Sequence, residues 1–368
     1  MTGLRSTLGR MFGGSAAEVE GAPEADLVAA PTDADELARL LDFASEHGLT
    51  VLPWGAGTHQ GFGGRVDPDI VVSTAGFGEI VDWQPEDLTA VVGAGVALGE
   101  LDDRLTDRRQ SAVLPETSRD ATVGGVVAAG VSGWRRLRYG PTRDRMLEVT
   151  LVTGDGRIVR GGARVVKNVT GYDLPRLLTG SLGSLGVITS VCLKLWPLPE
   201  RTVTVVVDDP VSAAATAFRP LAVLETRDRS SVHLAGTAAE VDAQSSALGG
   251  EVLEGSVWPD GPDGECVVRV RVPPADLPRF VERLSGPFVA AHGVGEIVAA
   301  VGPDEIAELR SDAEAAGGSV VVERAPEPVY DEIDPWGTAP ATLPLQRRIK
   351  GAFDPVGVMV PGRLPGGL

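Results

Sequence analysis

Residues 53–64 read PWGAGTHQGFGG, and five of these twelve residues are glycine. The residues before them, TVLP at 50–53, form a short run that predicts a strand ending where the glycines begin. Glycine lets the backbone approach a ligand closely and lets consecutive N–H groups point at one anion. The segment therefore predicts a strand that leads into an anion-binding loop.

A second glycine-rich run lies at 114–133 and reads LPETSRDATVGGVVAAGVSG. Each run carries a threonine hydroxyl beside its glycines, Thr58 in the first and Thr122 in the second. Two such loops from distant parts of a chain can enclose one diphosphate from both sides. The residues alone leave a second interpretation open, in which the glycines only form turns.

The usual single-loop phosphate motifs are absent from the sequence. A dinucleotide-binding GxGxxG loop needs glycine or alanine at its last position, where the runs starting at Gly55 and Gly93 have Gln60 and Leu98. No glycine run is followed by the GK[ST] triplet of a Walker A loop. Any phosphate site in this chain must therefore be built in another way.

The 368-residue chain has a formal net charge of −18, which repels nucleic-acid phosphates and anionic membranes. We therefore expect no nucleic-acid partner. A dinucleotide is also an anion, so a site for it needs backbone N–H groups and local positive charge that act against the overall field.

The composition also argues against metal chemistry within the chain. Cys192 and Cys266 form no CxxC pair, so we expect buried apolar residues rather than ligands of an iron–sulfur cluster. The four histidines form no HxH or HExxH pair, and no metal site is predicted. No apolar stretch has the length of a signal or a membrane span, which predicts a cytoplasmic protein that does not cross the membrane.

The pattern of apolar and turn residues divides the chain into four expected parts. These are a flexible tail over 1–24, a domain that holds both glycine runs over 25–199, an α+β cap or substrate domain over 200–325, and a linker with a C-terminal segment that returns to the first domain over 326–368.

Local signals predict several elements within these parts. Thr32 with Asp35 resembles a capping box for a helix that Gly48 ends. A hairpin is expected over 147–161, where two alternating runs flank a Gly-Asp-Gly turn. The residues from 267 onward follow the ferredoxin-like order β-α-β-β-α-β, and 202–254 show a weaker version of it.

Five segments, taken in order, resemble the FAD-binding domain that is shared by vanillyl-alcohol oxidase, D-lactate dehydrogenases and glycolate oxidase. They are the two glycine runs, RYGPTRDRMLEVTLVTGDGRIVRGG (138–162), RVVKNVTGYDLPRLLTGSLGSLGVITSVCLKLWPLP (164–199) and FDPVGVMVPGRL (353–364). The resemblance implies an α+β fold, with a two-subdomain PCMH-type FAD-binding domain followed by a smaller, ferredoxin-like cap.

Within this family the chain is most similar to the FAD-containing E subunit of glycolate oxidase. Catalytic D subunits and D-lactate dehydrogenases usually read GSEGTLG where this chain reads GSLGSLG at 180–186, so that Leu182 replaces an acid. Some members bind flavin covalently through a histidine or cysteine. This chain has Thr58 at that position, with His59 next to it, which implies non-covalent FAD.

The resemblance also implies a set of FAD-binding residues on both flanks of the cofactor. They are Gly55, Ala56, Gly57, Thr58 and His59 in the first run, then Pro115, Thr122, Gly124, Gly125, Gly130, Ser132, Asp144, Val187 and Ile188.

Polar residues offer weaker candidates for catalysis. Lys167 and Tyr172, with Asn168 between them, lie in the segment that the family places near the flavin ring, where a lysine would stabilise the reduced flavin. A surface lysine and a packed tyrosine are the alternative. Four arginines, Arg136, Arg138, Arg143 and Arg145, are expected either to neutralise FAD phosphates or a substrate carboxylate, or to be solvated loop charges.

The function implied by the resemblance is an FAD-dependent oxidoreductase subunit that oxidises glycolate or a related 2-hydroxy acid by hydride transfer. Because the chain lacks cluster ligands, electrons would pass to an iron–sulfur subunit, alongside a second flavoprotein subunit. A partner could also hold the chain at a membrane. Two alternatives stay open, namely an accessory FAD-binding or assembly subunit without catalysis, and an oxidase of another alcohol or sugar.

Overall fold

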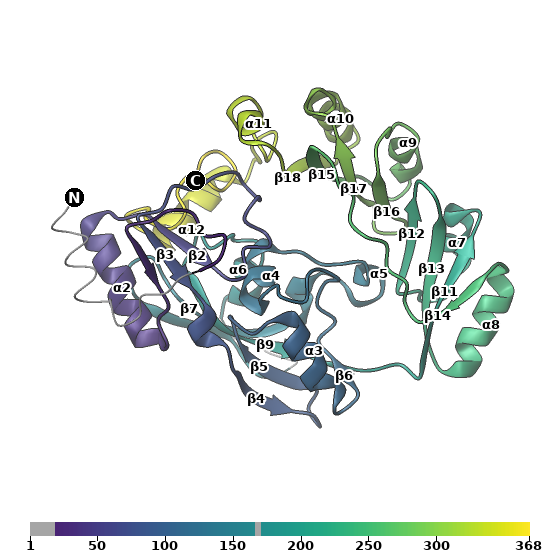
Figure 1. Ribbon diagram of the computed structural model, residues 1–368, viewed down its shortest axis with the longest axis horizontal. Coiled ribbons are helices and arrows are strands. Elements are labelled where there is room, and N and C mark those ends of the chain that lie inside the picture. Colours follow the sequence, from purple (N-terminus) through teal and green to yellow (C-terminus); the bar gives the residue numbers. More distant parts are fainter. Residues whose placement is uncertain (1–18, 166–170) are drawn as a thin grey trace.

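A computed structural model describes residues 19–165 and 171–368. Figure 1 shows two lobes that lie side by side. The first lobe holds the strands up to β10 (Trp196–Pro197), and the second, which we call the cap, holds the strands from β11 (Arg201–Val207) to β18 (Ser319–Arg324). The C-terminal chain, drawn in yellow, returns to the first lobe.

The first lobe begins with a small parallel sheet of order β1-β3-β2, made of β1 (Leu27–Ala29), β3 (Ile70–Ser73) and β2 (Val51–Trp54). Helix α2 (Ala34–His47) packs its apolar face, including Leu37 and Leu41, into the same core cluster as Val51 and Ile70. Strand β2 ends where the first glycine run begins, as the sequence predicted.

The start of α2 differs by one residue from the predicted capping box. Asp33, rather than Thr32, is the N-cap residue and accepts a hydrogen bond from the Glu36 amide at 2.7 Å. The Glu36 carboxylate in turn accepts from the Thr32 amide at 3.0 Å. The sequence holds two overlapping candidates with the same spacing, Thr32 with Asp35 and Asp33 with Glu36, and the longer glutamate side chain can reach back. Gly48 ends the helix at a φ of 65°, as predicted.

A five-stranded antiparallel sheet completes the first lobe in the order β4-β5-β9-β7-β8. Its strands are β4 (Ile80–Gln84), β5 (Thr89–Gly93), β9 (Val187–Lys194), β7 (Met146–Val152) and β8 (Ile158–Gly162), while β6 (Gln110–Ser111) pairs with β10. Strands β7 and β8 confirm the predicted hairpin, with Val152 paired to Ile158.

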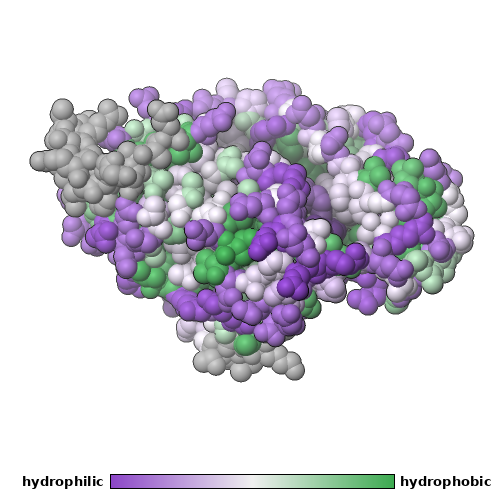
Figure 2. All heavy atoms as spheres, turned by 60° about the horizontal axis from the view of Figure 1, so that its bottom comes forward, coloured by the Kyte–Doolittle hydropathy of each residue, from purple (hydrophilic) through white to green (hydrophobic). Residues whose placement is uncertain are grey.

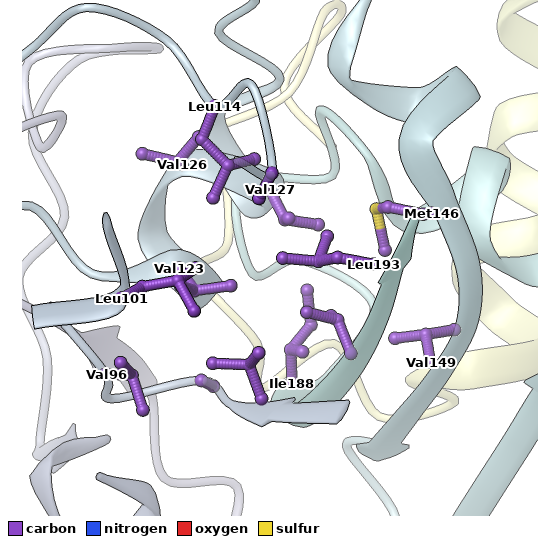
Figure 3. Packing of buried hydrophobic residues seen from close by; sticks show 14 of the residues in the cluster. Val96, Leu101, Leu114, Val123, Val126, Val127, Met146, Val149, Ile188 and Leu193 are labelled. Atoms are coloured by element: carbon purple, nitrogen blue, oxygen red, sulfur yellow. The ribbon is translucent and has the colours of Figure 1, made fainter. Parts of the chain in front are cut away.

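Short helices connect the strands of the first lobe. They are η2 (Ala75–Phe77), α3 (Leu98–Thr106), α4 (Val123–Ala129), α5 (Arg136–Tyr139), η3 (Thr142–Arg145) and α6 (Leu174–Leu178). Of these, α4, η3 and α6 contact the five-stranded sheet. Figure 3 shows Val123, Val126 and Val127 of α4 directed toward Ile188 and Leu193 of β9. This packing fixes the second glycine run against the core. Cys192 and Cys266 are both buried, as predicted.

The cap is one eight-stranded antiparallel sheet of order β14-β11-β13-β12-β16-β17-β15-β18. Its first half is β11, α7 (Pro210–Thr216), β12 (Ala222–Thr226), β13 (Ser230–Gly236), α8 (Ala238–Leu248) and β14 (Val252–Glu254). Its second half is β15 (Cys266–Arg271), α9 (Leu277–Val281), β16 (Phe288–Ala291), β17 (Glu296–Val301), α10 (Pro303–Ala315) and β18. Each half follows the order β-α-β-β-α-β, which confirms the ferredoxin-like prediction. The halves join where β12 pairs with β16, with Leu224 opposite Ala291.

The segment around α5 connects the lobes. Leu137 packs against an apolar cluster of the first cap half, and Trp134 packs against the cluster that joins the halves. The Arg136 guanidinium lies 2.9 Å from the Glu296 carboxylate of β17, and Arg138 donates to the Ala235 carbonyl at 2.6 Å. Packing and charge together hold the cap against the glycine-run lobe.

The C-terminal chain contains α11 (Glu327–Glu332) and α12 (Leu343–Phe353) and then lies along β2. The Val51 amide donates to the Val358 carbonyl at 2.9 Å, and the Val360 amide donates to the Val51 carbonyl at 3.1 Å. This segment therefore supports the strand that enters the first glycine run. In the described part of the chain, no helix combines the length and the apolar composition needed to cross a membrane.

Candidate functional site

The two glycine runs meet at one pocket in the first lobe. A Cβ atom on Gly55 would lie 2.2 Å from the Thr122 hydroxyl oxygen, so the runs touch at this point. The pocket brings together ten of the predicted FAD-binding residues: Gly55, Ala56, Gly57, Thr58, His59, Thr122, Gly124, Gly125, Val187 and Ile188.

The first run presents unused backbone donors. Within residues 19–165 and 171–368, no hydrogen-bond acceptor faces the amide N–H groups from Gly55 to His59. Gly57 has a φ of 72°, and a Cβ atom there would lie 2.7 Å from the Trp54 ring. This conformation favours glycine, and consecutive free N–H groups suit an anion such as a diphosphate.

The second run uses its amides differently from the first. The Val123 amide donates to the Val96 carbonyl at 2.9 Å, and the Gly124 amide donates to the Ala94 carbonyl at 2.8 Å. The Gly125 amide donates to the Thr122 hydroxyl at 3.2 Å. These donors are already bonded, so the second run contributes close packing rather than free N–H groups.

Other predicted residues lie outside this pocket. Pro115 lies against Gly133, where its Cα would be 2.6 Å from a Cβ on that glycine. Gly130 and Ser132 line a neighbouring cleft. Asp144 forms an ion pair with Arg176 at 3.0 Å, which links η3 to α6.

The two weak catalytic candidates are not placed in the pocket. Tyr172 is 91% exposed and does not line the pocket or the two cavities beside it. Lys167 and Asn168 fall outside the described residues.

His59 lies at the junction of the pocket with a cavity of about 370 Å³ between the lobes, because it and Thr58 line both. Its Nδ1 atom is 2.9 Å from the Thr58 hydroxyl. Burial lowers the pKa of His59, Glu323 acts against this shift, and Arg269 adds to it. The ring is therefore neutral at pH 7 and can accept a proton.

A second cleft, of about 360 Å³, carries an excess of positive charge. Its ionisable lining residues are Arg136, Arg143, Arg269, Arg271 and Glu323. Figure 2 shows the surface hollowed where the lobes meet, with hydrophilic residues beside the hollow. In a chain of net charge −18, four arginines around one cleft favour an anionic ligand.

Two cap acids hold these arginines in place. Arg269 is ion-paired with Glu296 at 2.6 Å and with Glu323. Burial opposes ionisation of Glu296, yet the guanidinium groups of Arg269, Arg271 and Arg136 hold its pKa at about 2. The network keeps Arg269 and Arg271 on one face of β15, directed at the first lobe.

The arginines grouped in the sequence thus separate in the structure. Arg136 and Arg143 line the cleft, whereas Arg138 binds a cap carbonyl. Arg145 is fully buried and donates to the Gly140 carbonyl at 2.6 Å. Burial lowers its pKa to about 10. Arg145 is therefore a structural residue of the loop around η3.

Sequence reasoning missed three arginines of the site. Arg269 and Arg271 are two residues apart in the apolar strand β15, a spacing that places both on one face. Arg363 lines the glycine pocket from the C-terminal tail. Free N–H donors, a buried cation and glycines that admit a close ligand together fit the diphosphate of a dinucleotide such as FAD.

Comparisons with known proteins agree with this site. Residues 25–162, which contain both glycine runs, match a family described as an FAD binding domain. Glycolate oxidase subunit GlcD of Bacillus subtilis is 36% identical over 49% of this chain and 38% of its own length. Glycolate oxidase subunit GlcE of Escherichia coli is 29% identical over 77% of this chain and 84% of its own length. An uncharacterised FAD-linked oxidoreductase of Mycobacterium tuberculosis is 27% identical over 94% of this chain.

The chain spans about two fifths of GlcD and of a D-lactate dehydrogenase of Archaeoglobus fulgidus, at 38% and 40% of their lengths. Among solved structures, an alkyldihydroxyacetonephosphate synthase superposes with a TM-score of 0.64 at 15% identity and covers 93% of this chain and 78% of its own. This likeness confirms the predicted PCMH-type fold class. Residues 25–162 therefore form an FAD-binding domain, and the chain is similar to glycolate oxidase subunits and D-lactate dehydrogenases.

Proposed function

We propose that this protein is an FAD-dependent oxidoreductase subunit that oxidises glycolate or a related 2-hydroxy acid. The observation that carries the proposal is the continuity between two cavities. The glycine pocket and the cavity between the lobes share Thr58 and His59. A cofactor held in the first would thus lie beside a space for substrate.

The arginine cleft supplies the second part of the proposal. A 2-hydroxy acid carries a carboxylate, and guanidinium groups bind carboxylates with paired hydrogen bonds. Arg143 and Arg271 are the more exposed cations, with side chains 52% and 47% exposed. Each has one acidic neighbour, Asp144 at 3.9 Å from Arg143 and Glu296 at 2.9 Å from Arg271, whereas Arg269 is held between two glutamates and is 14% exposed. We therefore assign the substrate carboxylate to Arg143 and Arg271.

Bound FAD would supply the acceptor for a hydride from the carbon that carries the hydroxyl group. The hydroxyl proton then needs a base, and the product is a 2-oxo acid. His59 is the residue we assign to this role, because its ring is neutral and lies where the two cavities join. Its contact with the Thr58 hydroxyl orients the ring.

The two electrons must then leave the protein. Cys192 and Cys266 are both buried and lie on different lobes, and no group of three metal-ligating side chains occurs among the described residues. We propose transfer to a separate iron–sulfur subunit, in a complex that also holds a second flavoprotein subunit. The likeness to two different glycolate oxidase subunits supports such an assembly.

One observation favours an accessory role instead. Leu182 lines the glycine pocket with a φ of 53°, at the position where catalytic relatives were expected to have an acid. The likeness to GlcE extends over most of both chains, whereas the likeness to GlcD covers 49% of this chain. In this second function the subunit binds FAD for assembly, and the oxidation takes place in a partner.

Anaerobic mixing of the FAD-loaded protein with glycolate, D-lactate or L-lactate separates the two functions. The catalytic proposal expects at least one acid to bleach the flavin absorbance. His59→Asn should slow this bleaching by about 100-fold, since a positioned base contributes 10²–10⁴-fold, while dithionite still reduces the variant fully. If dithionite bleaches the wild-type flavin and no hydroxy acid does, the catalytic proposal is wrong and the accessory role is supported.

A further inference from the structure

Arg363 is a buried cation that has no acidic partner in the described chain. Its side chain donates to the Phe62 carbonyl at 2.9 Å, the Gln60 side-chain oxygen at 2.7 Å and the Gln60 carbonyl at 2.6 Å. A guanidinium has five N–H donors, so two of them are left without a partner among the described residues. Only 4% of the residue is exposed.

A buried charge is costly unless an opposite charge balances it. Burial lowers the pKa of Arg363 to about 10, and the group is still protonated at neutral pH. Three neutral oxygens satisfy part of its hydrogen bonding but none of its charge. An anion close to Arg363 would balance this charge and could accept from its remaining N–H donors.

The position of Arg363 is fixed by the surrounding chain. The tail that carries it is bonded to β2 through Val51, and the Trp336 indole N–H donates to the Arg363 carbonyl at 3.0 Å. On the other side, a Cβ on Gly63 would lie 2.2 Å from the same carbonyl oxygen. Arg363 is thus held against the glycine run whose amides are free.

Lys350 provides an instructive contrast from the same segment. It is also buried, but its Nζ atom lies 2.6 Å from the Asp354 carboxylate and donates to the Ser184 and Met359 carbonyls. All three N–H donors of this ammonium group have acceptors and its charge is balanced. Lys350 therefore has a complete set of partners, whereas Arg363 lacks a balancing charge.

We propose that Arg363 is a cofactor-binding residue that balances the charge of the FAD diphosphate in the first glycine run. Arg363 and the amides from Gly55 to His59 line one pocket, so a diphosphate there would meet both. The net charge of −18 repels an anionic cofactor, so its site needs local positive charge. Arg363 supplies such a charge. The inference rests on FAD binding but not on the substrate, so the hydroxy-acid experiment can fail while this one succeeds.

Ligand titrations of the apoprotein test the proposal. FAD and ADP carry a diphosphate, whereas riboflavin carries the flavin without one. Arg363→Gln should weaken FAD and ADP by about 10- to 100-fold, the range expected for a hydrogen bond to a charged group, and should change riboflavin affinity by less than about twofold. Arg65→Gln is the matched control. Arg65 directly follows the first glycine run in sequence, but its side chain is exposed and is paired with Glu327. This variant should leave all three affinities unchanged.

Equal weakening of FAD and riboflavin by Arg363→Gln would mean that the residue only supports the loop, and would overturn the proposal. Unchanged FAD affinity would overturn it as well. If thermal melting shows that Arg363→Gln does not fold, Arg363→Lys decides. The ratio of FAD affinity to riboflavin affinity is then compared between Arg363→Lys and the wild type. A ratio within about tenfold of the wild-type ratio supports a role of the positive charge, and loss of the preference for FAD contradicts it.

Discussion

The first glycine run leaves its amide N–H groups from Gly55 to His59 without acceptors in the described structure, whereas the second bonds the amides of Val123, Gly124 and Gly125 within the protein. Both runs looked alike as sequence, and both line one pocket. In the first, glycine permits a backbone conformation that exposes donors. In the second, it permits close packing of α4 against the chain that follows β5. A glycine-rich run therefore predicts that something approaches its backbone closely. It does not predict whether that is a ligand or another segment of the protein.

The largest expected effect comes from Gly124 in the second run. A Cβ there would lie 2.6 Å from the Ala94 Cβ and 2.9 Å from the Ala94 carbonyl oxygen. Because neither atom belongs to a flexible side chain, the backbone itself would have to move. Gly124→Ala should lower the free energy of unfolding of the apoprotein by about 3 kcal/mol, the upper range for overpacking. Urea denaturation without FAD measures this. A variant as stable as the wild type would show that α4 packs less closely than described.

A double-mutant cycle tests the contact between the runs. Gly55→Ala should cost about 2 kcal/mol of apoprotein stability through its clash with the Thr122 hydroxyl. Thr122→Ala removes the N-cap of α4 and should cost about 1 kcal/mol. Since removing the hydroxyl makes room for the new methyl group, the double variant should cost about 1 kcal/mol less than the sum. Strict additivity would contradict the contact.

Gly57→Ala in the first run should act mainly on the cofactor. Its φ of 72° costs a non-glycine residue roughly 1–2 kcal/mol, and a Cβ atom there would lie 2.7 Å from the Trp54 ring. Relief of the strain and of this contact moves the free amides. FAD affinity should fall by about tenfold, as isothermal titration can measure, while riboflavin binding stays nearly constant. If the variant loses apoprotein stability but keeps its FAD affinity, Gly57 serves packing rather than cofactor binding. The first glycine run would then have the same role as the second.

The smallest expected effect is a pH dependence from His59. Burial lowers the pKa of His59 in the apoprotein, so the ring is neutral at pH 7. The base role requires a neutral ring when FAD is bound, so a ring that is protonated at low pH must lose its proton on binding. FAD affinity should therefore fall about two- to threefold as the pH falls from 7.5 to 5.5. His59→Asn should remove this fall, and an unaltered slope in that variant would place the titrating group elsewhere.

The sequence predicts those features that depend on local pattern. The strand before Gly55, the hairpin over 147–161 and the two ferredoxin-like units all follow from periodicity and turn residues that lie close together. The family resemblance implied a set of candidate FAD-binding residues, and the structure gathers ten of them in one pocket. The shift of the α2 N-cap from Thr32 to Asp33 is a choice between two equal local patterns.

The remaining features depend on contacts between distant segments. The amides of the second run find their acceptors at Ala94 and Val96, some thirty positions earlier. Arg363 enters the pocket only because the tail pairs with β2, about three hundred positions away. Arg269 and Arg271 belong to the site because β15 turns one face toward the first lobe. No local pattern carries that information.

Hydrogen–deuterium exchange of the apoprotein, with and without FAD, tests the difference between the glycine runs most directly. We predict that a peptide covering Gly55 to His59 exchanges rapidly in the apoprotein and becomes protected when FAD is added, because its amides gain acceptors. A peptide covering Val123 to Val126 should be protected in both states. Slow exchange of the first peptide without FAD, or no change when FAD saturates the protein, would contradict the account.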